Sequence, residues 1–346
     1  MKSVRSDRVF LKKKQNTPIL LHLVRAGTLA VTFLLLFSLV APGNLLSEAA
    51  AFFIPQLIAA GFIGLLIWLV MARRLHWLHL LCLLGLIISS FWMVTSIRLV
   101  RQPTAILENH PDSKSFDVMS LNLLHMQFGK EALQELIEKR QPDLIVFQET
   151  ASATPRLQAF LRENYQYAIL PPEKKDTDLT VFSKFPLENS KRNLVPGLGF
   201  NGYIPREFLS ADVNVNGRKI QLYAIHPASP RSKRRLNGRT TYVDYVSKHI
   251  QKHRTDTPIM VLGDWNTPVW SDTFQKLLAD LKLKTTFTSF VPQTTRYFIN
   301  PFLGKVLGSK VDHITSSEKI IIKDLMIGED VGSDHFPIFA TLHILP

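Results

Sequence analysis

Apolar residues dominate the first third of this chain, whereas apolar and polar residues are mixed in the rest. Three stretches, at residues 19–40, 52–71 and 78–97, are almost wholly apolar, and the second and third contain no Lys, Arg, Asp or Glu. A helix needs about 20 mostly apolar residues to cross the hydrocarbon core of a bilayer. The pattern therefore predicts three transmembrane helices within residues 19–97. A cleaved signal peptide is the alternative for the first stretch, but its apolar run is long and two further spans follow it.

The segments that flank these stretches differ in charge. The tail at residues 1–18 is basic, the second connection holds Arg73 and Arg74, and the first connection, at residues 41–51, holds no Lys or Arg. Because Lys and Arg are in excess on the cytoplasmic side of membrane proteins, we expect the tail in the cytoplasm. Three crossings then place a linker at residues 98–115, and everything after it, on the outer side.

The chain has 346 residues, a formal net charge of +13 and one cysteine. Residues 1–109 hold 11 Lys and Arg against 3 Asp and Glu, and residues 110–346 hold 30 against 25. Most of the excess lies beside the apolar stretches, where a membrane explains it better than nucleic acid does. The mildly basic remainder suits an anionic substrate. Cys82 can form no disulfide within the chain, so cysteine usage does not identify the redox compartment.

From residue 116 on, the pattern is that of a mixed α/β domain. Alternation and short buried runs predict strands at 116–124, 142–150 and 258–264, and Asn216-Gly217 between two alternating runs predicts a hairpin. Predicted helices lie at residues 129–141, 236–253 and 272–281, and further strands lie around 311–317 and 334–344.

Polar side chains recur at the ends of these strands. One Asp or Asn after a strand is ordinarily a turn residue, but six strands that each carry a polar residue of this kind at an end predict a single cluster at one sheet edge. These residues are Asn122, Glu149, His226, Asp264, Asn266, Asp312, Asp334 and His335. His313 faces away from Asp312 if the strand alternates, so we place it outside the cluster. Asp112, Asp176 and Asp178 are interpreted as loop residues.

The residue types of the cluster indicate its chemistry. Carboxylate and amide oxygens without cysteine suit a hard divalent ion such as Mg²⁺, and His with Asp suits proton transfer near neutral pH. A zinc site would show several closely spaced His or Cys. Ser333 lacks the G-x-S-x-G motif expected of a nucleophilic serine.

Six stretches in order along the chain resemble motifs of the endonuclease/exonuclease/phosphatase superfamily. They read SLNLLH, DLIVFQET, AIHPASP, VLGDWNTP, KVDHITSS and GSDHFPI. The segment that follows His226 resembles in particular the membrane-anchored bacterial members, which would place this chain in a bacterial plasma membrane. The resemblance implies a four-layer α/β/β/α sandwich over residues 116–346, phosphoester hydrolysis, and Mg²⁺ as cofactor, with Mn²⁺ as an alternative.

The resemblance also implies a metal site. Glu149 would be the main ligand of Mg²⁺, Asn122 would lie beside it, and Asp334 would be close enough to contribute.

It further implies catalytic roles. Asp264 would orient or deprotonate the attacking water, with Asn266 alongside. His335 would hold the scissile phosphate, and Asp312 would pair with His335 to fix its tautomer and charge. His226 would be a second phosphate-facing histidine and a general acid for the leaving group.

Arginines supply further candidates for substrate contact. The basic segment after His226 contains Arg231, Arg235 and Arg239, which would contact a phosphate or an anionic membrane surface; a solvated basic loop is the alternative. Arg206 and Arg296 are additional candidates.

Three functions remain open at this point. A membrane-anchored phosphoesterase would act on a lipid or lipid-linked phosphate and would have membrane lipids as partners. The sequence indicates no obligate protein partner. A membrane-tethered nuclease outside the cytoplasm is the second. A non-catalytic membrane module that retains the fold is the third, but Glu149, Asp264 and His335 are all present, which argues against it.

Overall fold

The computed structural model describes residues 19–103, 110–124, 128–150, 154–172, 178–198, 207–287, 289, 291 and 293–346. The predicted basic tail at residues 1–18 and the candidate Arg206 lie outside the described residues.

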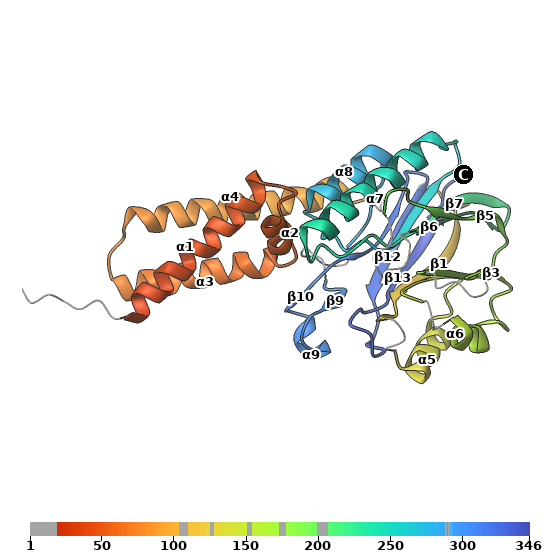
Figure 1. Cartoon of the computed structure of the whole chain (residues 1–346), viewed down its shortest axis with the longest axis horizontal. Helices are drawn as coiled ribbons and strands as arrows, with labels where there is room; N and C mark the ends of the chain where they lie inside the picture. The colour runs from red at the N-terminus through yellow and green to blue at the C-terminus, as the bar shows by residue number, and fades with distance from the viewer. Residues whose placement is uncertain are drawn as a thin grey trace, which may run out of the picture.

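Three long apolar helices form a bundle at the N-terminal side of the structure (Figure 1). They are α1 (Ile19–Val40), α3 (Ile54–Ala72) and α4 (Trp77–Val100), with the short helix α2 (Leu45–Ala51) between the first two. Each long helix has the length and composition to cross a membrane, with a mean hydropathy of 2.1 to 2.2. Small residues bring the helices close together, because a Cβ on Gly64 would lie 2.6 Å from the Thr28 hydroxyl. The three predicted stretches thus match the three helices to within a few residues.

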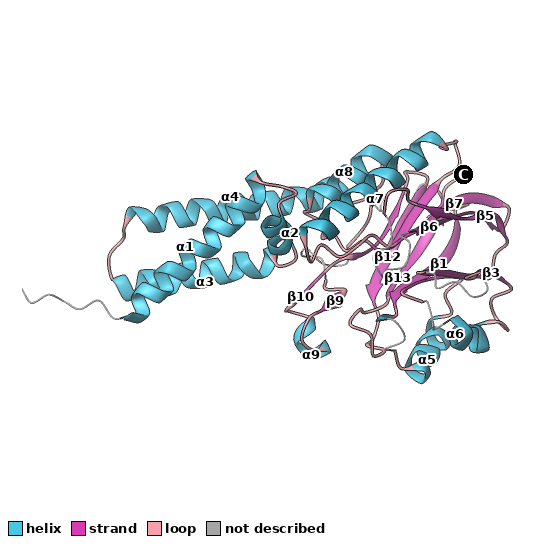
Figure 2. Ribbon diagram, viewed as in Figure 1, coloured by secondary structure: helices cyan, strands magenta, loops and turns pink. Residues whose placement is uncertain are grey.

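Two sheets pack face to face in the second part of the chain (Figure 2). The first has the strand order β12-β13-β1-β2-β4-β3, and the second has the order β11-β8-β7-β6-β5. The strands of the first sheet are β1 (Lys114–Asn122), β2 (Leu144–Gln148), β3 (Tyr167–Ile169), β4 (Leu179–Ser183), β12 (Ile320–Ile327) and β13 (Ile338–Ile344). Those of the second are β5 (Leu187–Leu194), β6 (Glu207–Val215), β7 (Arg218–Ile225), β8 (Ile259–Asp264) and β11 (Asp312–Ser316). A two-stranded ribbon, β9 (Arg296–Tyr297) with β10 (Gly308–Ser309), lies beside them.

Helices cover the outer face of each sheet. The first sheet is covered by α5 (Lys130–Arg140) and α6 (Thr154–Leu161), and the second by α7 (Lys233–Lys252) and α8 (Asp272–Leu281) (Figure 1). The inner faces share one apolar core, in which Val118 and Val146 of one sheet meet Leu222 and Leu262 of the other. This is the predicted four-layer α/β/β/α sandwich, preceded by three long apolar helices.

Local sequence accounts for three backbone positions with positive φ. Asn216 and Gly217 both have positive φ, at 50° and 89°, as the predicted Asn-Gly hairpin turn requires. Gly263 has a φ of 135°, and a Cβ there would lie 2.1 Å from the Ile225 carbonyl oxygen. Only glycine can therefore occupy the position that precedes Asp264.

Several elements were not predicted. Strands β3, β4 and β5 were missed. Because β3 and β4 are short and β5 is largely exposed, none of the three shows a clear apolar period. The four-residue helix α9 (Pro301–Gly304) and strand β12 were also missed. The predicted linker at 98–115 is shorter than expected, since α4 continues to Val100 and β1 begins at Lys114.

The helix bundle is docked on the α/β domain through buried polar contacts. The Glu48 carboxylate of α2 accepts a hydrogen bond from Arg239 Nη2 of α7 at 2.5 Å, and both side chains are almost fully buried. Trp270 Nε1 donates to the Ala51 carbonyl oxygen at 2.5 Å, and Gln275 Nε2 donates to that of Ser96 at 3.0 Å. The bundle and the domain therefore share one interface in which a carboxylate from one part neutralises a guanidinium from the other.

We expect Glu48→Ala to destabilise the full chain strongly, because it leaves the Arg239 guanidinium buried without its carboxylate. Breaking a buried ion pair in this way costs about 3–5 kcal/mol. Removing the second charge as well, in Glu48→Ala/Arg239→Met, should restore much of the lost stability. Thermal unfolding of the purified full chain in detergent, followed by tryptophan fluorescence, checks both expectations.

The exposed pair Lys139–Glu329 provides the control, because its side chains are 58% and 72% exposed. Glu329→Ala should leave the unfolding midpoint unchanged within error. An equal loss of stability in the Glu48 single and double variants would contradict the coupling.

Candidate active site

An amide from one sheet joins carboxylates from both. Asn122, at the end of β1, is buried, and its Nδ2 donates to Glu149 Oε1 at 3.1 Å and to Asp264 Oδ2 at 3.0 Å. Strands β1 and β2 are parallel neighbours with Asn122 in register with Gln148, which brings Glu149 alongside. The edge where the two sheets meet is therefore where these polar strand ends converge.

Glu149 follows β2 with a backbone conformation that is uncommon for a residue with a side chain. Its φ is +55°, in the left-handed region, and its side chain is 19% exposed. Strain of this kind in a non-glycine residue is concentrated at functional sites. The turn directs the carboxylate toward Asn122 and toward His226, whose Nε2 lies 3.8 Å from Glu149 Oε1.

His226 forms a hydrogen-bonded pair with Asp178. The distance from His226 Nδ1 to Asp178 Oδ2 is 2.6 Å, and His226 Nε2 lies 3.4 Å from Asp264 Oδ2. Burial disfavours the imidazolium, but the carboxylates of Asp178 and Asp264 outweigh it and raise the pKa of His226 to about 10. His226 is therefore a protonated imidazole whose Nε2 faces the carboxylates of the cluster.

Asp178 is a loop residue, as predicted, but it also belongs to the cluster, which the sequence analysis missed. It directly precedes β4, where β4 pairs with β2 next to Glu149, and it is 3% exposed. The buried Glu207 carboxylate accepts the backbone N–H of Asp178 at 3.1 Å and holds it in place. The signal was available, because a polar residue stands next to a buried run here as it does at the predicted sites.

Asp264 and Asn266 form a closed turn after β8. Asp264 Oδ1 accepts the backbone N–H of Asn266 at 2.8 Å, and Asn266 Nδ2 donates to Asp264 Oδ2 at 3.1 Å. Burial alone would raise the pKa of Asp264, but His335, His226 and Arg296 together hold it well below its usual range. Asp264 is thus an ionised carboxylate although it is 1% exposed.

Asp312 and His335 form the second carboxylate–imidazole pair. Asp312 lies directly opposite Asp264 in the antiparallel pairing of β11 with β8, and its Oδ2 is 2.9 Å from His335 Nδ1. Despite burial, Asp312 and Asp264 raise the pKa of His335. His335 Nε2 faces Asp264 Oδ2 at 3.7 Å. As alternation predicts, His313 lies on the other face, where it contacts the Phe274 ring and bonds the Thr267 carbonyl.

Arg296 enters the cluster from the β9–β10 ribbon. Its Nε and Nη2 donate to Asp334 Oδ2 at 3.2 and 3.1 Å, and its Nη1 donates to Asn266 Oδ1 at 3.3 Å. Asp334 Oδ1 is buried, lies 3.8 Å from His335 Nε2 and has no hydrogen-bond partner among the described residues. One oxygen of Asp334 thus pairs with a cation while the other faces the site.

The cluster offers oxygen ligands suited to a divalent cation. Asp264, Asp312 and His335 each have a ligand atom within 4.8 Å of the others. Asp312 and His335 are already hydrogen-bonded to each other, however. The carboxylates of Glu149 and Asp334, with the Asn122 side chain, are hard donors of the kind Mg²⁺ prefers. The residues present therefore fit the predicted ion.

The structure places the three arginines of the predicted basic segment in different environments. Arg231 is exposed and Arg235 is partly buried at the start of α7, which begins at Lys233. Arg239 is fully buried, and its Nη1 donates to the Asn266 carbonyl oxygen at 2.9 Å while its Nη2 bonds Glu48. Arg239 therefore does not meet a substrate, in contrast to the prediction; it supports the Asn266 turn from behind.

The fold and the motif residues agree with a known family. A model of the Endonuclease/Exonuclease/phosphatase family matches residues 119–335. The chain belongs to this family. Its members are hydrolases that act on phosphoester bonds, and this chain is an enzyme of that class. The predicted resemblance is thereby confirmed.

Solved structures share the fold at low sequence identity. The endonuclease/exonuclease/phosphatase from Beutenbergia cavernae is 18% identical with a TM-score of 0.55, over 67% of this chain and 72% of that one. A beta toxin mutant from Staphylococcus aureus with bound magnesium ions is 16% identical with a TM-score of 0.52, over 65% and 99%. Sphingomyelinase C from Streptomyces griseocarneus is 15% identical with a TM-score of 0.50, over 66% and 99%. A search of curated proteins finds no match.

We expect Asp178→Asn to move the alkaline limb of the activity profile to lower pH. The Asp178 carboxylate helps to raise the pKa of His226, so its removal allows the imidazolium to lose its proton earlier as pH rises. The loss of activity relative to the native chain should be smaller at pH values below the shifted limb than at pH values above it. The pH dependence of kcat/KM for the full chain checks this.

Asp324→Asn, at an exposed position on β12, is the matched control and should keep the native profile. A uniform loss at every pH in Asp178→Asn would contradict an effect through His226.

Proposed function

We propose that this protein is a membrane-anchored, Mg²⁺-dependent phosphoesterase that hydrolyses a lipid or lipid-linked phosphoester outside the cytoplasm. The observation that carries the proposal is the Asn122 bridge, which gathers Glu149 and Asp264 between two carboxylate–imidazole pairs. Carboxylates and imidazoles paired at one sheet edge are suited to a phosphate and an attacking water.

Glu149, Asn122 and Asp334 would hold the metal ion. Bound there, Mg²⁺ would stabilise the negative charge that develops on the phosphoryl oxygens. Arg296 neutralises one oxygen of Asp334, which would leave the other for the ion or its water.

Asp264 is the group that would orient the attacking water. It is ionised, and the two donors Asn122 and Asn266 fix its Oδ2. His335 would bind the scissile phosphate through its Nε2, because Asp312 engages its Nδ1. His226, held in the same way by Asp178, would donate a proton to the leaving oxygen.

The membrane side of the proposal is supported by the docked bundle. Three helices that could span a bilayer contact the domain through α2, and Arg239 links Glu48 of α2 to the carbonyl of Asn266. The site is thus built against the end of the bundle, where lipid headgroups would lie. The likeness to a sphingomyelinase C fits a lipid substrate as well.

We expect Asp264→Asn to lower kcat by about 10²–10⁴-fold, the range for loss of a general acid or base. The assay uses the full chain in lipid nanodiscs with Mg²⁺, because the α2 interface buries Glu48 and Trp270. Asp256→Asn, in an exposed loop, is the control and should keep full activity. Native turnover in Asp264→Asn would refute its assignment.

Removal of divalent ions should abolish hydrolysis reversibly. Treatment with a chelator, followed by Mg²⁺ or Mn²⁺, should restore activity to the native chain. Glu149→Gln should require a higher Mg²⁺ concentration, because one ligand oxygen is replaced by a neutral amide. Full activity in the chelator would exclude metal-assisted catalysis.

The substrate class is tested with the same nanodiscs. Phospholipids and polyprenyl phosphates in the bilayer are compared with single-stranded and duplex DNA in solution, each against Asp264→Asn. Lipid cleavage supports the proposal, and cleavage of DNA alone, with binding that weakens steeply in salt, would make the protein a tethered nuclease. Hydrolysis of neither class would refute both substrate classes.

A further inference from the structure

An exposed apolar segment lies between the two strands of the β9–β10 ribbon. It runs from residue 298 to 307, contains α9, and is called here the α9 segment. Phe302 is 85% exposed, Val306 68% and Ile299 67%. Its other exposed apolar side chains are Phe298, Leu303 and Leu307. A contiguous group of large apolar side chains on a protein surface marks an interaction site.

The α9 segment is tied to the end of a candidate membrane span. Gln56, in the first turn of α3, donates hydrogen bonds to the carbonyl oxygens of Val306 and Gly308 at 2.8 and 2.9 Å. The Phe298 ring lies 5.1 Å from the Phe53 ring, just before α3. Figure 2 shows α9 with β9 and β10 on the side of the domain that faces the long helices. The segment is thus level with the point where α3 would enter a bilayer.

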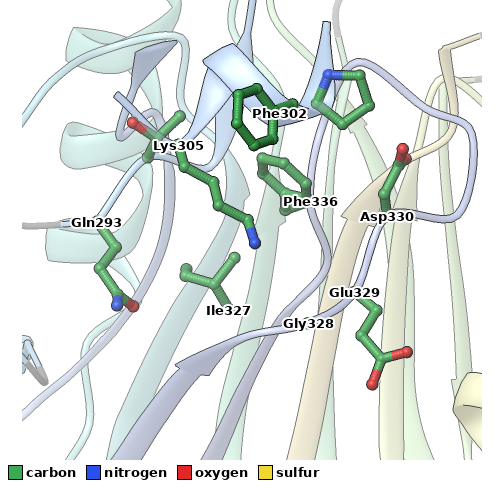
Figure 3. Close-up of a pocket in the computed structure, with 10 residues that line it drawn as sticks. Gln293, Phe302, Lys305, Ile327, Gly328, Glu329, Asp330 and Phe336 are labelled. Atoms are coloured by element: carbon green, nitrogen blue, oxygen red, sulfur yellow. The ribbon is translucent and has the colours of Figure 1, made fainter. Parts of the chain in front are cut away.

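Gly304 of α9 packs on Tyr297 of β9, but other residues of the segment border open space. Phe302 and Lys305 line a cavity of about 530 Å³ together with Ile327 and Phe336 (Figure 3). A helix that belonged to the domain core would fill this space with its apolar side chains, but Phe302 remains mostly exposed. The apolar side chains of α9 are therefore not there to stabilise the domain.

We propose that the α9 segment is a membrane-contact surface, with its apolar side chains in the boundary between headgroups and acyl chains of the outer leaflet. The occupant is the bilayer, because the segment is hydrogen-bonded to the first turn of α3, and the exposed apolar surface of that helix begins within the next turn, at Ala59 and Ala60. Phe side chains are typical of such interfacial segments, and the Lys305 ammonium can reach lipid phosphates. The inference rests on the proposed membrane insertion of the three helices.

The contact would place the catalytic cluster at the level of the headgroups. Arg296 lies two residues before Phe298, its guanidinium stacks over the Phe298 ring at 5.6 Å, and it binds Asp334. A lipid phosphoester could then reach the site without leaving the bilayer. This deepens the proposed function, since it explains how a lipid substrate rather than a soluble one would be favoured.

The test places a fluorescent label on the α9 segment. Phe302→Cys is introduced in a Cys82→Ala background, because Cys82 is the only native cysteine. The full chain is reconstituted as one copy per nanodisc of phosphatidylcholine and phosphatidylglycerol. Spin-labelled lipids should quench the label, and aqueous iodide should quench it weakly. Ser190→Cys, at an exposed position on β5, which lies on the side of the domain away from the long helices (Figure 1), is the control and should show the reverse.

Two outcomes would overturn the inference. Quenching of the Phe302 label by iodide alone would place the segment in water. Protection from both quenchers would show that protein covers it. Neither outcome depends on catalysis, so a failure here is distinct from a failure of the proposed function.

A second measurement links the surface to substrate. Phe302→Ser/Val306→Ser should raise KM for a bilayer-borne phosphoester by about tenfold, since two apolar side chains leave the interface. Turnover of a small soluble phosphoester should be unchanged, because neither residue touches the catalytic cluster. Equal kinetics of the native chain and this variant on the bilayer substrate would refute a role in lipid access.

Discussion

The Asn122 amide is the contact on which the site depends. It is the end of a strand in the first sheet, and it donates to Glu149 of the same sheet and to Asp264 of the other. Two sheets that pack through apolar side chains alone could slide relative to each other at little cost, because such contacts are not directional. A buried amide with two carboxylate acceptors fixes their relative position at the edge where the chemistry occurs.

The site concentrates titratable side chains that are almost fully buried. Asp264, Asp312, His226 and His335 are each 3% exposed or less. Isolated burial of such groups in their charged forms would be prohibitive, and here each imidazole lies beside two of the carboxylates. The two imidazoles lower the pKa of Asp264, and the carboxylates raise the pKa values of the two imidazoles, whereas burial raises the pKa of Asp312. The removal of one member is therefore expected to change the protonation of the others.

The helix bundle is part of the site's support. Glu48 neutralises Arg239, Arg239 holds the Asn266 carbonyl, and Asn266 donates to Asp264. This chain of contacts runs from a seven-residue helix between two membrane-type helices to the carboxylate at the centre of the cluster. The bundle thus contributes to the catalytic architecture as well as to its location, and the α9 segment extends the same contact along the α/β domain.

The sequence by itself determined the three apolar helices, the fold class and eight polar strand ends, because the patterns that mark them are local. The length of an apolar stretch predicts a membrane-spanning helix, and apolar residues at every second position predict the buried face of a strand. Tertiary structure alone decided which partners these residues have. Asp178 and Arg296 belong to the cluster, and Arg239 turns away from the substrate to meet Glu48, which is 191 residues distant in the chain. Such pairings depend on how sheets and helices pack, and no local pattern encodes that.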